Sequence, residues 1–327
     1  MTPLASLLAA RIAREGPIPF RDFMDAALYH PEHGYYRRPH DPFGIHGDFF
    51  TAEQLQPVFG ILVAQRIRQL ASALGDPPDF TVVELGAGRR EMAQAFSPWR
   101  YCPVDIDGGE IPRGFRGVVF SNEFFDALPV RAVKYEDGAF RELLVTFEGE
   151  TFHWISGPAV DSAAEEYLRR FYPPPQEGRC CEVPPLQPWV ERIAGALDDG
   201  WVLTIDYGFT REESIRFPRG TLMGYRRHAA LDDVLHAPGE RDITAHVNFS
   251  ALRELFEARG FATERFETLA SMLLTAGEAD QFSSALGDAG DAARRRGQLK
   301  QLLFGMGETF RVLLQRWDPN RRDVPEK

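Results

Sequence analysis

Short apolar runs that end in glycine or polar residues recur along the chain and predict buried strands. Three of them lie close together, at 81–88, 101–106 and 117–123, and a fourth spans 201–208. Each run is apolar on successive residues rather than on alternate ones, which is typical of a strand covered on both faces. We therefore predict a parallel sheet at the centre of the fold.

Apolar residues at helical spacing flank these runs. They predict an amphipathic helix over residues 1–15 and a longer helix that begins at Thr51, with Gln54 completing a capping-box pattern. The segment 30–50 between these helices is rich in Gly, Pro and His and is expected to be a loop. A later helix that contains Pro188 is expected to end at Gly200. The alternation of strands and helices predicts a doubly wound α/β domain.

The hydrophobic period changes to an alternating one between residues 128 and 180. Runs at 130–135, 140–147 and 151–155, separated by Asp-Gly and Glu-Gly turns, predict a three-stranded antiparallel meander. We interpret this part as an insertion. The expected organisation is then N-terminal helices and an active-site loop at 1–75 packed on the core, an inserted subdomain at 128–180, and a core at 76–127 and 181–317 with a helical insertion at about 269–304.

Polar and glycine residues at the ends of the predicted strands are the candidates for a ligand site, because doubly wound sheets bind ligands beyond the carboxyl ends of their strands. The residues expected to converge there are Glu84, Gly86, Gly88, Asp105, Asn122, Glu123, Asp206 and Tyr207. The glycines would let a ligand approach the backbone, and Asp105 is placed to accept hydrogen bonds from ribose hydroxyls. A plain tight turn is the alternative. The G-x-G-x-x-G fingerprint is incomplete, with Glu91 in its last position, which disfavours a nicotinamide dehydrogenase.

The segment 121–129, Ser-Asn-Glu-Phe-Phe-Asp-Ala-Leu-Pro, carries a second group of candidate residues. The carboxylates of Glu123 and Asp126 are suited to binding a guanidinium group, and the two phenylalanines to contacting a planar base or a cation. The alternative is a capped turn whose aromatic rings, Phe124 and Phe125, lie in the core.

Composition narrows the classes of partner. The 37 Lys and Arg residues are outnumbered by 48 Asp and Glu residues, for a net charge of −11, which disfavours a nucleic-acid partner and suits a small molecule or a basic protein. We find no apolar run long enough for a membrane helix. Three cysteines, two of them adjacent, form no disulfide framework, so we expect a cytoplasmic location. No metal site is expected, since His30 and His33 lack a third ligand.

Taken in order, these motifs resemble the MidA family of S-adenosylmethionine-dependent methyltransferases, whose mitochondrial members are complex I assembly factors. The most specific stretch is 122–130, Asn-Glu-Phe-Phe-Asp-Ala-Leu-Pro-Val. Further matching segments lie at 16–20, 30–36, 47–51, 83–89, 206–208, 220–222, 225–228, 242–247 and 306–308. The resemblance implies a class I methyltransferase-like, Rossmann-type α/β fold with a mostly parallel sheet and an inserted subdomain.

The resemblance also implies S-adenosylmethionine (SAM) as cofactor and a protein substrate, with arginine as the acceptor in the mitochondrial members. The residues it places at the cofactor are Glu84, Gly86, Ala87, Gly88, Asp105, Ile106, Gly47, Asp48 and Thr51. Those it places at methyl transfer are Asn122, Glu123 and Asp126. Glu53 and Gln54 stand where the family has Pro and Glu, and Arg90 replaces a glycine. A SAM-binding assembly or interaction protein without turnover is the alternative function.

Overall fold

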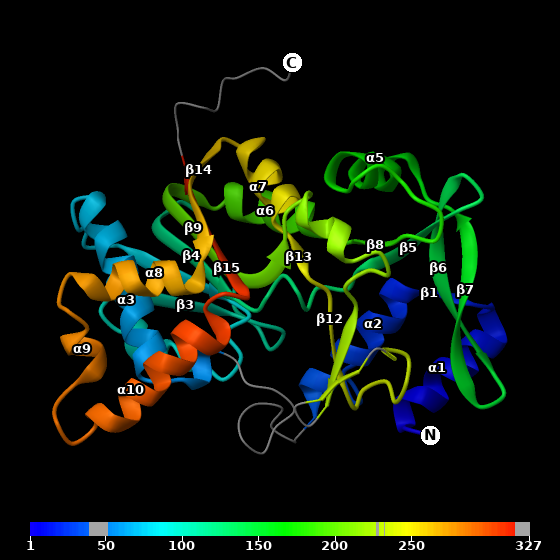
Figure 1. The fold of residues 1–327 in the computed structure, drawn as a ribbon, viewed down its shortest axis with the longest axis horizontal. Helices are drawn as coiled ribbons and strands as arrows, with labels where there is room; N and C mark the ends of the chain where they lie inside the picture. Colours follow the sequence, from blue (N-terminus) through cyan, green and yellow to red (C-terminus); the bar gives the residue numbers. More distant parts are fainter. Residues whose placement is uncertain (39–51, 227–228, 232, 318–327) are drawn as a thin grey trace. The chain divides into compact units, whose positions relative to one another are not determined.

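The computed structural model describes residues 1–38, 52–226, 229–231 and 233–317 (Figure 1). The chain forms two compact units, each built from three separate segments. One unit contains Met1–Phe50, Asp126–Pro185 and Phe209–Ser250, and the other contains Thr51–Phe125, Leu186–Gly208 and Ala251–Lys327. This division differs from the predicted organisation, which assigned residues 209–250 to the core and treated the N-terminal segment and the insertion as separate parts.

A mixed sheet forms the centre of the second unit, and its strands follow the order β14-β15-β9-β4-β2-β3 (Figure 1). The predicted parallel strands are present as β2 (Thr81–Leu85), β3 (Arg100–Val104), β4 (Phe115–Asn122) and β9 (Leu197–Phe209). At the other end, β15 (Phe310–Trp317) lies antiparallel between β9 and β14 (Phe261–Thr268). The predicted mostly parallel sheet is therefore confirmed, with one antiparallel strand inserted near its edge.

The register of the parallel strands brings their carboxyl ends to one edge. Leu85 pairs with Val104 on one side and with Ser121 on the other, and Asn122 pairs with Ile205. The residues that follow these positions therefore emerge together, as the sequence predicted. The segment 105–114, all of it described, contains no strand, so β3 is the edge strand and the sheet is shortened there.

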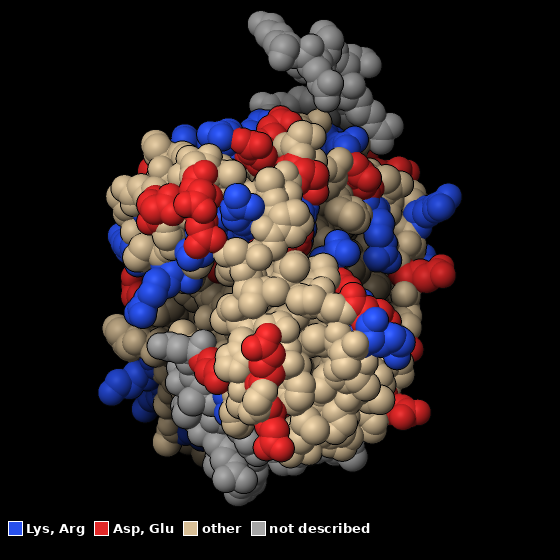
Figure 2. Space-filling model, turned by 90° about the vertical axis from the view of Figure 1, so that its right-hand side faces the viewer, with Lys and Arg blue, Asp and Glu red and all other residues tan. Residues whose placement is uncertain are grey.

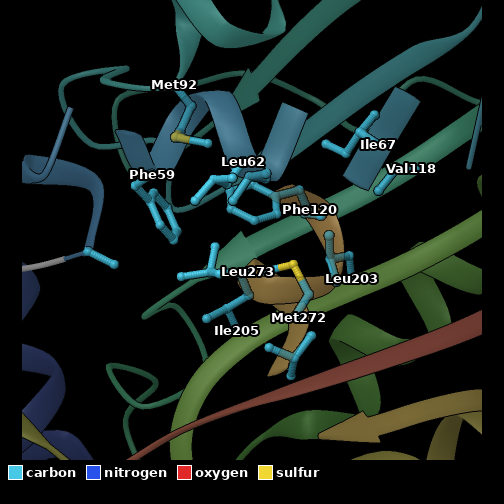
Figure 3. Packing of buried hydrophobic residues seen from close by; sticks show 14 of the residues in the cluster. Phe59, Leu62, Ile67, Met92, Val118, Phe120, Leu203, Ile205, Met272 and Leu273 are labelled. Atoms are coloured by element: carbon cyan, nitrogen blue, oxygen red, sulfur yellow. The ribbon is translucent and has the colours of Figure 1, made fainter. Parts of the chain in front are cut away.

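Helices and apolar side chains form the core of this unit. Figure 3 shows Phe59 and Leu62 from α3 (Val58–Ala73) close to Phe120 of β4, with Leu273 of α8 (Leu269–Glu278) nearby. All four side chains are fully buried, and burial of each stabilises the fold by about 1.5–3 kcal/mol. The remaining helical elements are α4 (Ala93–Phe96), α6 (Leu186–Ala194), α7 (Phe249–Glu257), α9 (Ser283–Leu286), α10 (Ala292–Lys300) and a π-helical turn, Gln301–Met306.

Two helix boundaries differ from the prediction. Helix α3 begins at Val58 rather than at Thr51, because Pro57 disfavours a helical conformation in the residue before it. A short 3₁₀ turn, Ala52–Gln54, precedes it, and the predicted Thr51 cap lies outside the described residues. Helix α6 ends at Ala194 rather than at Gly200, because the next residues from Leu197 join β9 and pair with β4.

The first unit contains the predicted antiparallel meander, within a sheet that has two further strands. Its strands β5 (Arg131–Glu136), β6 (Ala139–Glu148) and β7 (Thr151–Ala159) pair antiparallel, and α5 (Ser162–Phe171) follows. Two short strands that the sequence analysis missed, β1 (Ile18–Pro19) and β8 (Cys180–Val183), complete the sheet. A second small sheet, which the sequence analysis did not predict, contains β10 (Met223–Arg226), β11 (Ala229–Leu231) and β12 (Asp242–Thr244).

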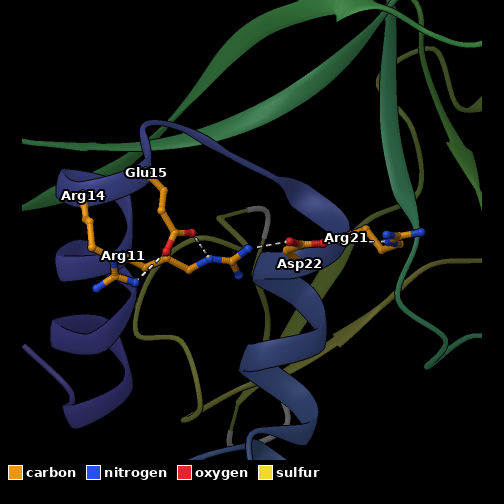
Figure 4. Close-up of polar contacts among 5 residues, drawn as sticks. All are labelled: Arg11, Arg14, Glu15, Arg21 and Asp22. Carbon is orange, nitrogen blue, oxygen red and sulfur yellow. Dashed lines mark hydrogen bonds and ion pairs between the residues drawn. The ribbon is translucent and has the colours of Figure 1, made fainter.

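Helices α1 (Pro3–Glu15) and α2 (Phe20–Tyr29) are joined by an ion-pair network in this unit (Figure 4). Arg11 lies 3.0 Å from Glu15 on its own helix and 2.7 Å from Asp22 on α2. Because these side chains are partly exposed, each pair contributes at most about 1 kcal/mol. Burial of the apolar faces of the two helices stabilises this part of the unit more strongly.

Charge is mixed on the surface that Figure 2 shows, where basic side chains are interspersed with acidic ones. The described residues on that face therefore present no single-sign field that would steer a charged partner. Among the described residues, no helix combines the length and apolar character needed to cross a membrane.

Candidate active site

The glycine loop 86–88, which follows β2, is hydrogen-bonded to the end of β3 and to Asp105 after it. The backbone N–H groups of Gly86 and Ala87 donate to the carbonyl of Val104, at 2.9 and 3.3 Å. The carboxylate of Asp105 accepts hydrogen bonds from the backbone N–H of Gly88 at 2.5 Å and of Ile106 at 2.6 Å. The predicted cofactor loop and the predicted ribose acid therefore lie in contact at the carboxyl edge of the sheet.

Glu84 is a buried acid directly before this loop. Its side chain is 1% exposed, and one carboxylate oxygen accepts a hydrogen bond from the hydroxyl of Tyr101 on β3. Burial raises the pKa of Glu84 to about 8, although the Tyr101 hydrogen bond acts to lower it. The other oxygen, Oε1, has no hydrogen-bond partner among the described residues. A ligand that donates a hydrogen bond, or carries positive charge, would satisfy it.

Glu53 is a second buried acid, and the sequence analysis did not select it. It lies in the 3₁₀ turn Ala52–Gln54 and is 8% exposed. Burial and the nearby negative charges of Glu84 and Glu123 raise its pKa well above the ordinary value for a glutamate. The only feature of the sequence that points to Glu53 is that it directly precedes Gln54, the position at which the family has a glutamate. Such a group of buried carboxylates favours the binding of a cation.

The turn after β4 presents Glu123 in a strained backbone conformation. Its φ is +51°, a left-handed value that residues other than glycine rarely adopt and that often marks functional positions. One oxygen of its carboxylate accepts from the backbone N–H of Ala52 at 3.3 Å and from the side-chain amide of Asn122 at 3.2 Å. The amide oxygen of Asn122, itself a buried residue, has no partner among the described residues.

The two phenylalanines of this turn pack against other rings. Phe125 is buried, and Phe124 makes edge-to-face contacts with Phe125 and with Trp189 of α6, with ring centroids 5.1 and 4.8 Å apart. A Cβ atom on Gly86 would lie 3.0 Å from the ring of Phe124. Phe125 therefore lies in the core, as the packing alternative expects, whereas Phe124 is only half-buried and lies against the glycine loop.

Four further predicted site residues have no described position relative to this edge. Gly47, Asp48 and Thr51 lie outside the described residues. Asp126 belongs to the first unit, where it is buried and its carbonyl accepts a hydrogen bond from the backbone N–H of Ala245. Its assignment, like that of the three loop residues, stays a prediction.

Comparison with known proteins identifies the family. A family model for S-adenosyl-L-methionine-dependent methyltransferases matches residues 94–267, more than half of the chain. A Drosophila melanogaster protein named protein arginine methyltransferase NDUFAF7 homolog, mitochondrial, is 30% identical over 318 residues, covering 79% of this chain and 70% of its own length. The chain belongs to this methyltransferase family. The human protein arginine methyltransferase NDUFAF7, mitochondrial, is 25% identical, with 79% and 70% covered.

A solved structure supports the same assignment for this methyltransferase. A COG1565 superfamily protein from Burkholderia thailandensis, bound to S-adenosyl-homocysteine, is 29% identical with a TM-score of 0.85, covering 96% of this chain and 92% of that one. The predicted class I methyltransferase-like fold and the predicted cofactor, SAM, are thereby confirmed. The orphan oxygen of Glu84, the glycine loop and Asp105 fit a ligand that carries an ammonium group, a sulfonium group and a ribose.

The predicted cytoplasmic location is wrong, because the curated relatives are named mitochondrial. The prediction rested on Cys102, Cys180 and Cys181, all of which are free in the structure. Free thiols indicate a reducing compartment only, and a reducing compartment is not restricted to the cytosol.

Proposed function

We propose that this methyltransferase transfers a methyl group from SAM to an arginine side chain of a protein. The names of the curated relatives support an arginine acceptor. The observation that carries the proposal is the position of Glu123, whose carboxylate lies at the carboxyl edge of the sheet in a strained turn, hydrogen-bonded to Asn122 and to the turn that holds Glu53.

The cofactor residues in this proposal are those on β2 and β3 and in the loops that follow them. Gly86, Ala87 and Gly88 would lie along the methionine part, with the carboxylate of Glu84 facing its positive charge. Asp105 and Ile106 would lie at the ribose. When bound, SAM supplies an activated methyl group together with its leaving group, so the protein mainly has to align the acceptor.

The acceptor residues would act on a guanidinium group, which stays charged at all ordinary pH values. The carboxylate of Glu123 binds and orients one guanidinium nitrogen toward the methyl group, with Asn122 holding that carboxylate in place. As the new C–N bond forms and the C–S bond breaks, the substituted nitrogen gives up its proton, and Glu123 is placed to accept it. Asp126, whose carboxylate also suits a guanidinium group, is a further candidate for the acceptor site.

Methyl labelling tests this function. The purified protein is incubated with tritiated SAM and a protein extract, and the labelled protein is hydrolysed to amino acids and separated. We expect the label in methylarginine, and less of it with an Asp105→Ala variant when SAM is kept below saturation. Label in methyllysine or another amino acid would contradict the arginine assignment. SAM binding without label would instead favour the alternative, a SAM-binding protein without turnover.

A further inference from the structure

Asp206 is a fully buried acid that neither the cofactor assignment nor the acceptor assignment uses. It lies near the carboxyl end of β9, and its exposed fraction is 0%. Its two carboxylate oxygens accept hydrogen bonds from different backbone groups. Oδ2 accepts from the N–H of Phe125 at 3.1 Å, and Oδ1 accepts from the N–H of Tyr207 at 2.9 Å. Asp206 therefore joins β9 to the turn that follows β4.

Two hydrogen bonds to β9 hold the backbone at the strained residue Glu123 and two residues after it. On one side, its own N–H donates to the carbonyl of Ile205 at 3.0 Å, which continues the ladder between β4 and β9. On the other side, the N–H of Phe125 has left the ladder and is bound by the side chain of Asp206. A left-handed conformation is strained in a residue with a side chain, and it persists only where the surroundings impose it.

A carboxylate is the group that suits this position. Each of its oxygens accepts one N–H, and neither offers a hydrogen that would oppose a donor. An asparagine of the same shape would keep one acceptor and turn an NH₂ group toward the other N–H. The side chain of Asp206 thus supplies an acceptor for a backbone donor that would otherwise be buried and unpaired.

We propose that Asp206 is a positioning residue for methyl transfer, which holds the 122–125 turn so that the carboxylate of Glu123 faces the acceptor nitrogen. The inference rests on the proposed role of Glu123. It assigns to Asp206 no contact with the cofactor or the acceptor, so its loss should lower the rate of transfer without lowering the affinity for SAM.

Asp206→Asn tests the proposal, with Thr204→Val as the matched control. Thr204 is equally buried on the same strand, and its hydroxyl has no hydrogen-bond partner among the described residues. We expect Asp206→Asn to lower the transfer rate at saturating SAM about tenfold or more, with a SAM Kd within about threefold of wild type. In a Glu123→Gln background the same change should have little further effect, because both act through one carboxylate.

Hydrogen exchange gives a readout that does not depend on turnover. The amides of residues 122–125 should exchange faster in Asp206→Asn than in Thr204→Val or wild type. Unchanged exchange, a wild-type transfer rate, or a full additional loss in the Glu123→Gln background would each overturn the proposal. If the wild-type protein transfers no methyl group, the proposed function is contradicted. Faster exchange in Asp206→Asn would then still show that Asp206 holds the 122–125 turn.

Discussion

The hydroxyl of Tyr101 on β3 donates a hydrogen bond to the carboxylate of Glu84 on the neighbouring strand β2. Glu84 is buried, and burial raises its pKa to about 8. Near neutral pH the ligand-free protein therefore keeps a proton on Glu84 for much of the time. A bound cation reverses this preference, because it favours the ionised carboxylate.

SAM binding should accordingly depend on pH. We expect its affinity to increase as the pH rises from 6 to about 8, because below pH 8 Glu84 is mostly protonated and binding must remove that proton. Calorimetry in two buffers of different ionisation enthalpy would show proton release on binding. In Tyr101→Phe, the hydrogen bond that lowers the pKa of Glu84 is lost, so the rise should shift to higher pH. An affinity that is constant from pH 6 to 9 would exclude this role for Glu84.

The same acid should make the stability of the ligand-free protein depend on pH. In the folded state the pKa of Glu84 is about 8, whereas its ordinary value is 4.5, so the folded state binds the extra proton between these values. The free energy of unfolding should therefore decrease as the pH rises from about 4.5 to about 8. Glu84→Gln removes this contribution, so over this range its urea-unfolding free energy should fall by roughly 4 kcal/mol less than that of wild type. Parallel curves for the two proteins would contradict the prediction.

Asp105 should affect cofactor affinity through two contacts. Its carboxylate already binds the backbone N–H of Gly88, so it holds the glycine loop and, in the proposed complex, the ribose. Asp105→Ala should weaken SAM binding by about 1–3 kcal/mol, measured by calorimetric titration. The control is Asp198→Ala, which removes the same charge from an exposed position in the same unit and should leave the affinity unchanged. Equal affinities in both variants would remove Asp105 from the cofactor site.

The sequence predicted the parts of the site that rest on strand ends. Apolar runs defined β2, β3, β4 and β9, and the parallel register then required Gly86, Asp105 and Glu123 to emerge at one edge. The segment 105–114 after β3 contains no strand, since ten residues leave little room for a helix and a strand.

Glu53 could not be predicted in the same way. It lies in the short 3₁₀ turn Ala52–Gln54, and the hydrogen bond from the N–H of Ala52 to Glu123 shows that this turn reaches the sheet edge. Such a contact depends on tertiary packing and leaves no periodic signal in the sequence. The sheet of β10, β11 and β12 was missed for a related reason, because its short strands lie in a segment rich in Arg, Gly and His.

Glu123 should be needed for transfer but not for cofactor binding. Glu123→Gln keeps the size of the side chain and an acceptor oxygen for Ala52, but removes the negative charge that would orient and deprotonate the guanidinium. We expect the transfer rate to fall by about 10²-fold or more, with a SAM Kd close to that of wild type. Rates come from tritiated-methyl incorporation and Kd from calorimetry. Glu278→Gln, an exposed position in the same unit, controls for the change in net charge. If Glu123→Gln transfers methyl groups at the wild-type rate, another group must orient the acceptor, and the proposed acceptor site is wrong.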